Sequence, residues 1–295
     1  MKDSYVVGVD IGGSHITAAL IDMHTKKIVE GSYIRQLINA GEDVTAIITG
    51  WSSVIRRSMN AHVPVAKIGI AMPGPFDYEN GICLIRGQDK YELLYNLNVK
   101  KLLAKELDID GNNIHLMNDA GCFLQGEVFG GAGQGTNSAI GVTLGTGLGS
   151  ARYENNKATD ADLWCMPFKD SIAEDYLSTR WFIKRYYELS GQQVANVKEL
   201  VNLTTNEKCR QLIFDEFGAN LASFFMRFID AWKKPEIIII GGNIALTEYL
   251  FMPELKKNLL SFGLDISIEI AKLGEAAPIF GAAGYWFSAP MVWQI

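Results

Sequence analysis

The sequence predicts an α/β protein built from a duplicated unit. Residues 6–22 and 138–151 share one design, in which an apolar run, a tip of small residues and a second apolar run follow each other. That pattern is typical of a β-hairpin, and its repetition indicates duplication. Elsewhere, segments with helical spacing of apolar residues alternate with short apolar runs. The length of 295 residues suits two domains of ordinary size or one duplicated unit.

Composition and charge limit the classes of partner. The hydrophobic share of 48% indicates a globular protein, and no apolar run approaches the ~18 residues of a membrane span. The 33 acidic residues outnumber the 27 basic ones, which gives a net charge of −6, and no long basic block occurs. We therefore expect neither nucleic acid nor a membrane as the main partner.

The cysteines and the start of the chain bear on the cellular compartment. The four cysteines are scattered without paired spacing, so neither a disulfide framework nor a CxxC zinc site is expected. The chain reaches its first predicted strand almost at once, which leaves no room for a signal peptide. We expect reduced thiols in a cytoplasmic protein.

The first hairpin turns at Gly12, Gly13 and Ser14. Adjacent glycines let backbone N–H groups face outward, which suits an anion such as a nucleotide phosphate, and Ser14 adds a hydroxyl. Asp10 ends the first strand, and we expect it to hold Mg²⁺ through the ion's waters, because a carboxylate does not bind phosphate directly. The alternative is an ordinary hairpin, since short glycine motifs recur by accident.

Two further glycine tips occur later in the chain. One glycine turn is weak support for a ligand site, but three of them, each at the end of a β-rich run, indicate backbone surfaces that converge on one ligand. The residues of these later tips are Thr143, Gly145, Thr146 and Gly147 in the second hairpin, and Gly241 and Gly242 after the most apolar strand.

The remaining segments are assigned from their apolar spacing. Strands are expected over residues 26–35, 67–72, 113–117, 237–240 and 266–271. Helices are expected over residues 41–61, 99–107, 120–129, 172–189, 197–228, 251–262 and 278–288. The aromatic-rich faces between residues 172 and 228 are expected to be core or dimer surface, and residues 130–135 are a flexible connector.

Two connections after predicted strands are candidate sites. Prolines make residues 73–77 a rigid loop, either a simple tight turn or the wall of a ligand site. Asn118 and Asp119 lie between a strand and a helix, where ligands of α/β folds gather. An aspartate at such a place caps the helix or acts as a base, and the residues alone leave both roles open.

Five segments together resemble the ROK family of sugar kinases and repressors. They are DIGGS (10–14), AMPGPFD (71–77), MNDAGC (117–122), TLGTGLGS (143–150) and IIIGGNIA (238–245). The resemblance covers nearly the whole chain and implies the actin and hexokinase superfamily, with two ribonuclease-H-like α/β domains around a cleft. The implied domains are residues 1–118, with a helix of about 278–295 packed back on them, and residues 119–277.

The resemblance implies a glucokinase-like reaction, in which the γ-phosphoryl of ATP passes to a hydroxyl of a hexose or hexose derivative. Asp119 is then the base, Asn118 orients the sugar, and the loop around Gly74 flanks it. The two hairpins cradle phosphates with Mg²⁺ placed by Asp10, and the third tip admits adenosine. A homodimer is also expected.

The sequence departs from the family at several positions. The PNLxGW-like sugar loop is missing, and so is the cysteine cluster that binds zinc, with Cys165 in place of a metal-binding histidine. No zinc site is therefore expected. Asp162 and Glu174 match the two sugar-binding glutamates, although in isolation each is a solvated charge or a cap. His15 takes a position that is commonly lysine, so it would neutralise phosphate less.

These departures leave a second hypothesis open, a sugar-binding sensor of the same fold that has lost turnover. The intact Asp119 and the two intact hairpins favour the kinase. A repressor is not expected, because such proteins carry a helix-turn-helix domain before the first strand and here only five residues precede it.

Overall fold

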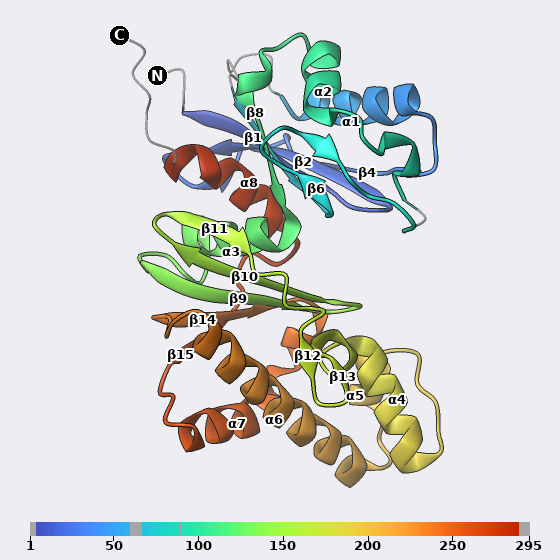
Figure 1. The fold of residues 1–295 in the computed structure, drawn as a ribbon, viewed down its shortest axis with the longest axis vertical. Helices are drawn as coiled ribbons and strands as arrows, with labels where there is room; N and C mark the ends of the chain where they lie inside the picture. Colours follow the sequence, from blue (N-terminus) through green and yellow to red (C-terminus); the bar gives the residue numbers. More distant parts are fainter. Residues whose placement is uncertain (1–3, 60–66, 89, 289–295) are drawn as a thin grey trace. The chain divides into compact units, whose positions relative to one another are not determined.

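The computed structural model describes residues 4–59, 67–88 and 90–288 (Figure 1). Packing divides the chain into two units. The first contains the residues up to Gly135, Asn155–Thr159 and the segment from Glu275 onward, and the second contains Thr136–Glu154 and Asp160–Gly274. The functional domains predicted from the sequence, with boundaries at 118/119 and 277/278 and a cleft between them, stay predictions.

The first unit is built on a six-stranded sheet of order β3-β2-β1-β5-β8, with β4 also paired to β2. Its strands are β1 (Tyr5–Ile11), β2 (His15–Asp22), β3 (Lys27–Ile28), β4 (Ile34–Leu37), β5 (Lys67–Met72) and β8 (Ile114–Asn118). β1 and β2 form the predicted antiparallel hairpin, and β1, β5 and β8 run parallel. The single strand predicted over residues 26–35 is wrong, because a turn at Gly31 (φ +76°) separates β3 from β4.

Helices cover both faces of this sheet. They are α1 (Val44–Ser58), α2 (Val99–Leu107), α3 (Asp119–Gly130) and α8 (Ala277–Ser288). Figure 1 shows α1 and α2 on one face and α8 on the other. The helix predicted over residues 41–61 begins later, at the Asp43 cap, and its last two residues lie outside the described residues. The end of the predicted C-terminal helix, residues 289–295, lies outside them too.

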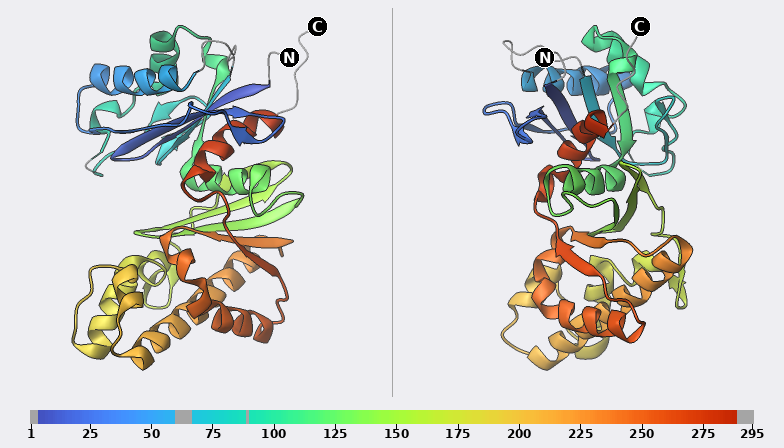
Figure 2. Two further views of the ribbon diagram at one scale, coloured as in Figure 1. Left: turned by 180° about the vertical axis from the view of Figure 1, so that it is seen from behind. Right: turned by 90° about the vertical axis from the view of Figure 1, so that its left-hand side faces the viewer.

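Glycines let α8 approach its neighbours closely. A Cβ on Gly8 of β1 would lie 2.2 Å from the carbonyl oxygen of Ile279, and one on Gly126 of α3 would lie 2.0 Å from that of Ala277. α8 therefore packs between the sheet and α3, and Figure 2 shows the two helices side by side.

The second unit repeats the hairpin plan in a sheet with the strand order β10-β9-β14-β15. The strands are β9 (Ser138–Leu144), β10 (Leu148–Glu154), β14 (Ile237–Gly241) and β15 (Ser267–Ile270). Strand β11 (Lys157–Asp160) follows β10 in the chain, and most of it belongs to the first unit. β9 pairs antiparallel with β10 and parallel with β14, as β1 does with β2 and β5. The duplication predicted from the two hairpins is thus visible in the topology.

An aromatic core holds the helices of the second unit against its sheet. The helices are α4 (Thr179–Ser190), α5 (Val197–Asn202), α6 (Glu207–Ala231) and α7 (Glu248–Ser261). The aromatic faces predicted as core or dimer surface are buried, including Phe182 and Phe217, which are fully buried. The helix predicted over residues 172–189 begins only at Thr179, and that over residues 197–228 is broken before Asn206, which adopts φ +62°.

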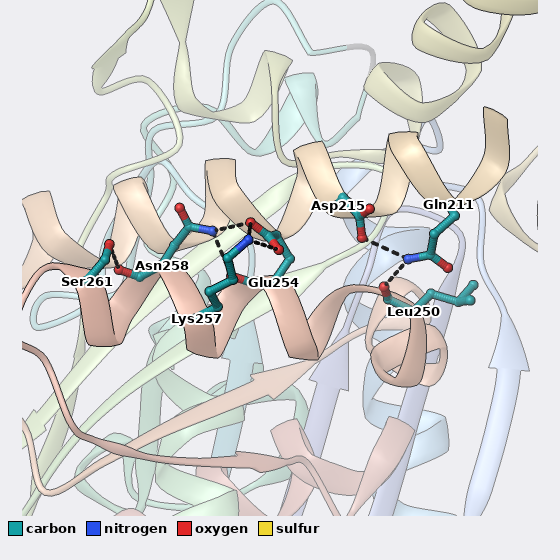
Figure 3. Close-up of polar contacts among 7 residues, drawn as sticks. All are labelled: Gln211, Asp215, Leu250, Glu254, Lys257, Asn258 and Ser261. Atoms are coloured by element: carbon teal, nitrogen blue, oxygen red, sulfur yellow. Dashed lines mark hydrogen bonds and ion pairs between the residues drawn. The ribbon is translucent and has the colours of Figure 1, made fainter. Parts of the chain in front are cut away.

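α6 and α7 pack closely at Gly218, where a Cβ would lie 2.6 Å from the carbonyl oxygen of Phe251. Gln211 of α6 donates from Nε2 to the carbonyl oxygen of Leu250 on α7 at 3.1 Å and to Asp215 at 2.8 Å (Figure 3). Within the described residues, none of the helices combines the length and the apolarity needed to cross a membrane.

Candidate functional site

Asp10, Asn118 and Asp119 gather at one edge of the first sheet. In the parallel register, Asp10 lies beside Ala71 of β5, and Met72 lies beside Asn118 of β8. The carboxyl ends of these strands therefore meet, as they do at ligand sites of α/β folds. The carboxylates of Asp10 and Asp119 are close enough to repel each other.

The surroundings of Asp10 oppose its ionisation. Burial raises the pKa of Asp10 to about 7, and the negative charges of Asp119 and Glu275 contribute to this rise. The positive charge of Arg35 acts in the opposite direction. Arg35 reaches this site because it lies opposite Thr17, which in turn lies opposite Asp10, in one cross-strand row. Its guanidinium is paired with the Glu275 carboxylate. A hydrogen bond with Tyr33 and the charge of Glu275 raise the pKa of Arg35.

Asn118, rather than Asp119, caps α3. The Asn118 Oδ1 accepts hydrogen bonds from the N–H groups of Ala120 at 2.8 Å and Gly121 at 3.2 Å. Asp119 is the first helical residue; its Oδ1 accepts from Ala120 N–H at 2.9 Å, and its side chain is exposed. The cap role that the sequence left open for Asp119 is filled by its neighbour, which leaves the Asp119 carboxylate accessible.

The loop at Gly74 is attached to the same edge. Tyr78 donates its hydroxyl proton to the carbonyl oxygen of Met72 at 3.0 Å, and Asn118 Nδ2 lies 3.4 Å from the Tyr78 hydroxyl. A Cβ on Gly74 would lie 3.3 Å from that hydroxyl. The side chains of Tyr78 and Asn118 therefore set the space beside Gly74.

The first glycine tip is open. Gly12 donates its N–H to the carbonyl oxygen of His15 at 2.9 Å, and Ser14 Oγ lies 2.9 Å from His15 Nδ1. A Cβ on Gly12 or Gly13 would meet no atom closer than 3.6 Å. Packing within the described chain thus gives no reason for glycine at these two positions.

The second glycine tip, Gly145 to Gly147, is held by the segment around Glu174. Thr179 donates both its N–H and its hydroxyl to the carbonyl oxygen of Gly145, at 2.8 and 2.9 Å. Glu174 Oε2 accepts from the N–H of Leu148 at 3.1 Å, and its Oε1 pairs with Arg180 Nη2 at 2.5 Å. The Glu174 carboxylate, predicted to bind sugar, therefore supports the tip.

The third tip packs against the second hairpin. Gly241 lies beside Thr143 in the parallel register, and Gly242 has φ +86°. A Cβ on Gly242 would lie 2.3 Å from the carbonyl oxygen of Leu144. The fold of the second unit requires glycine at position 242, whatever ligand its backbone also contacts.

The Asp162 side chain forms a hydrogen bond with a nearby residue of the same loop. Its Oδ1 accepts from the indole N–H of Trp164 at 2.8 Å, and its backbone is left-handed with φ +52°. Cys165 beside it is exposed. Across residues 4–59, 67–88 and 90–288, no three His, Cys, Asp or Glu side chains form a metal-binding group. The absence of zinc stays a prediction.

The family model described as ROK family matches residues 6–161 of this chain. The protein belongs to the ROK family.

This ROK protein is 26% identical to the glucokinase of Thermotoga maritima, over 94% of this chain and 96% of that protein. It is 23% identical to the N-acetyl-D-glucosamine kinase of Haemophilus influenzae, over 95% of this chain and 99% of that protein. A ROK family glucokinase from Streptomyces griseus, solved in complex with glucose and AMPPNP, has the same fold with a TM-score of 0.72 at 20% identity, covering 95% of this chain and 98% of that one. The predicted α/β fold is thereby confirmed.

Sequence reasoning missed several residues around the first tip of this ROK protein. Arg35 and Glu275 act on Asp10 from distant parts of the chain. Tyr91 donates its hydroxyl proton to the carbonyl oxygen of Gly12, and Lys90 lies beside Gly13. Only the pairing of β4 with β2 could have placed Arg35 in the row of Asp10. No local sequence pattern marks Glu275, Tyr91 or Lys90.

Proposed function

We propose that this ROK protein transfers the γ-phosphoryl of ATP to a hydroxyl of a hexose or hexose derivative, as a hexokinase or glucokinase does. The observation that carries the proposal is the meeting of Asp10 and Asp119 at one sheet edge, in the unit that also carries the open tip at Gly12 and Gly13. The sugar kinases among its relatives support the same class of reaction.

Asp119 is the proposed base. Its carboxylate is exposed, and the cap position of α3 is already filled by Asn118. It can therefore accept the proton of an attacking sugar hydroxyl while the helix stays intact. One N–H of Asn118 Nδ2 faces the Tyr78 hydroxyl, the second can donate to a sugar oxygen, and Gly74 leaves space beside it.

Mg²⁺ fits the environment of Asp10. Burial and the neighbouring Asp119 charge both disfavour an ionised Asp10, so a divalent cation would relieve this cost. Mg²⁺ is commonly held by one or two carboxylates, its own waters and substrate phosphates. We propose that Asp10 holds the ion through water; the bound ion would neutralise charge on the transferring phosphoryl group.

Backbone groups are the proposed nucleotide ligands. The N–H groups of the first tip, with Ser14 and His15, and those of the second tip, with Thr143, suit phosphate oxygens. The backbone of Gly241 and Gly242 is the proposed adenosine surface. Asp162 and Glu174 stay proposed sugar ligands, and a homodimer in the cytoplasm stays a prediction.

A sugar-binding sensor with weak turnover is the second candidate, and one observation favours it. Both carboxylates proposed for the sugar are engaged elsewhere, Asp162 with Trp164 and Glu174 with Leu148 and Arg180. In this case sugars would bind without rapid ATP consumption.

A screen of ATP consumption over hexoses, amino sugars and their N-acyl forms tests both candidates, with Asp119→Asn as the matched control. Sugar-dependent formation of ADP that is lost in Asp119→Asn supports the kinase. Saturable sugar binding by calorimetry, without ADP formation from any sugar, supports the sensor and overturns the kinase.

A further inference from the structure

We propose that Lys90 binds the nucleotide phosphates at the first glycine tip. This inference rests on the proposed function, because it takes ATP as the ligand of that tip. It assigns a role to a side chain that no glycine motif or strand end marks in the sequence.

The Lys90 side chain lies against the tip. A Cβ placed on Gly13 would be 3.6 Å from Lys90 Cδ, which is ordinary van der Waals contact. Lys90 Cδ therefore lies beside the bare face of Gly13, and the residue is partly buried. A lysine stem that packs in this way delivers its ammonium group next to the surface it covers.

The next residue fixes this position. Tyr91 is fully buried, its N–H donates to the carbonyl oxygen of Ala40 at 2.9 Å, and its hydroxyl donates to the carbonyl oxygen of Gly12. Its ring packs edge-on against Trp51 with 5.3 Å between centroids. Lys90 is thus held one residue away from a direct hydrogen bond to the tip.

The charge at this edge needs a cation. Asp10 and Asp119 already bring two carboxylates together, and a nucleotide polyphosphate adds further negative charge. A second cation, the Arg35 guanidinium, is paired with Glu275, and the His15 ring bonds to Ser14. A lysine ammonium is a compact charge with three donors on a flexible stem, which suits phosphate oxygens.

Calorimetry of ATP binding without sugar tests the proposal on the full chain. We expect Lys90→Met, which keeps the stem, to weaken ATP binding by about 10-fold to 100-fold, the range of a charge-assisted contact. The matched control is Lys27→Met. Lys27 is exposed and lies opposite Asp22, at the end of the hairpin away from the tip. The ATP affinity of Lys27→Met should therefore stay within about twofold of that of the unsubstituted protein.

Variants that restore a positive charge at the tip separate the effect of charge on ATP affinity from the effect of packing. Lys90→Arg should retain most of the affinity, and adding His15→Lys to Lys90→Met should restore part of it by returning a cation to the tip. ATP affinity of Lys90→Met within twofold of the unsubstituted protein, or an equal loss in Lys27→Met, would overturn the proposal. If ATP binding depends on Lys90 but no sugar is phosphorylated, the inference stands and the proposed kinase reaction fails.

Discussion

The glycine tips of the two units look alike in sequence but differ in what glycine does there. In the first unit, a Cβ on Gly12 or Gly13 would reach no atom within 3.5 Å, the nearest being 3.6 Å away. In the second unit, a Cβ on Gly242 would lie 2.3 Å from Leu144, and one on Gly147 would lie 2.6 Å from the Glu174 carboxylate. At positions 147 and 242 of the second unit, neighbouring atoms leave no room for a side chain, whereas Gly145 and the glycines of the first tip leave backbone open for a ligand.

The acidic edge follows the same contrast. In the first unit, the Asp119 side chain is exposed, whereas burial and neighbouring negative charges raise the pKa of Asp10. In the second unit, the Glu174 carboxylate already has two partners from the chain itself. We therefore place the proposed base and the proposed Mg²⁺ site in the first unit.

Asp119→Asn tests that placement with the largest expected effect. Sugar-dependent ATP turnover should fall by about 100-fold to 10,000-fold, the range of general-base assistance. The melting temperature and sugar affinity should change little, because Asn118 caps the helix and the amide is nearly isosteric. Turnover, sugar calorimetry and melting on one sample measure all three. Near-normal turnover would move the base to another carboxylate, with Glu174 the next to examine.

Gly242→Ala compared with Gly12→Ala tests the contrast between the tips. Gly242→Ala should lower the free energy of unfolding by about 2 to 4 kcal/mol, because its φ of +86° and the contact with Leu144 both oppose a side chain. Gly12→Ala should change that free energy by less than about 0.5 kcal/mol yet weaken ATP binding. Urea unfolding and ATP calorimetry measure the two effects. Equal stability losses in both variants would break the comparison.

Asp10→Asn tests whether the raised pKa of Asp10 makes the stability of the protein depend on pH. The pKa of Asp10 is raised to about 7 from 3.8. Between about pH 4 and pH 7 the unfolded chain loses this proton first, so stability falls as pH rises. Asn removes that cost: the variant should match the parent near pH 4 and exceed it by at most about 4 kcal/mol at pH 8, because each pKa unit is worth about 1.4 kcal/mol.

Urea unfolding at both pH values, without Mg²⁺ or ATP, measures this difference. A gain that is the same at pH 4 and pH 8 would contradict the raised pKa. The same variant should lose the Mg²⁺ dependence of ATP affinity if Asp10 holds the ion, and the parent measured without Mg²⁺ is the control.

Glu174→Gln gives the smallest expected effect. The amide keeps an oxygen that can accept from Leu148 N–H but loses the charge that pairs with Arg180. We expect a loss of about 1 kcal/mol in stability and a KM for ATP raised several-fold, since a loosened tip holds phosphate less well. Steady-state kinetics at varied ATP and varied sugar separate the two roles. A rise confined to the KM for sugar would favour a direct sugar contact instead.

Features that depend on local pattern could be predicted from the amino-acid sequence. The strands at 67–72 and 237–240 and the helix at 99–107 were predicted at or within one residue of their observed ends, because their apolar spacing is unambiguous. The three glycine tips and the place of Asp119 between strand and helix follow from the same local signals. The resemblance to the ROK family rests on the order of these motifs, and the family-model match over residues 6–161 confirms it.

Only the tertiary structure decided what each of these residues contacts. Local pattern did not show that Asn118 takes the cap, that Glu174 supports the second tip, or that Leu144 requires glycine at position 242. Nor could it bring Lys90 to Gly13 or Arg35 to the row of Asp10, because these partners are far apart in the chain. Periodicity fixes which face of a strand or helix is buried, but packing and strand register fix which distant side chain meets it there.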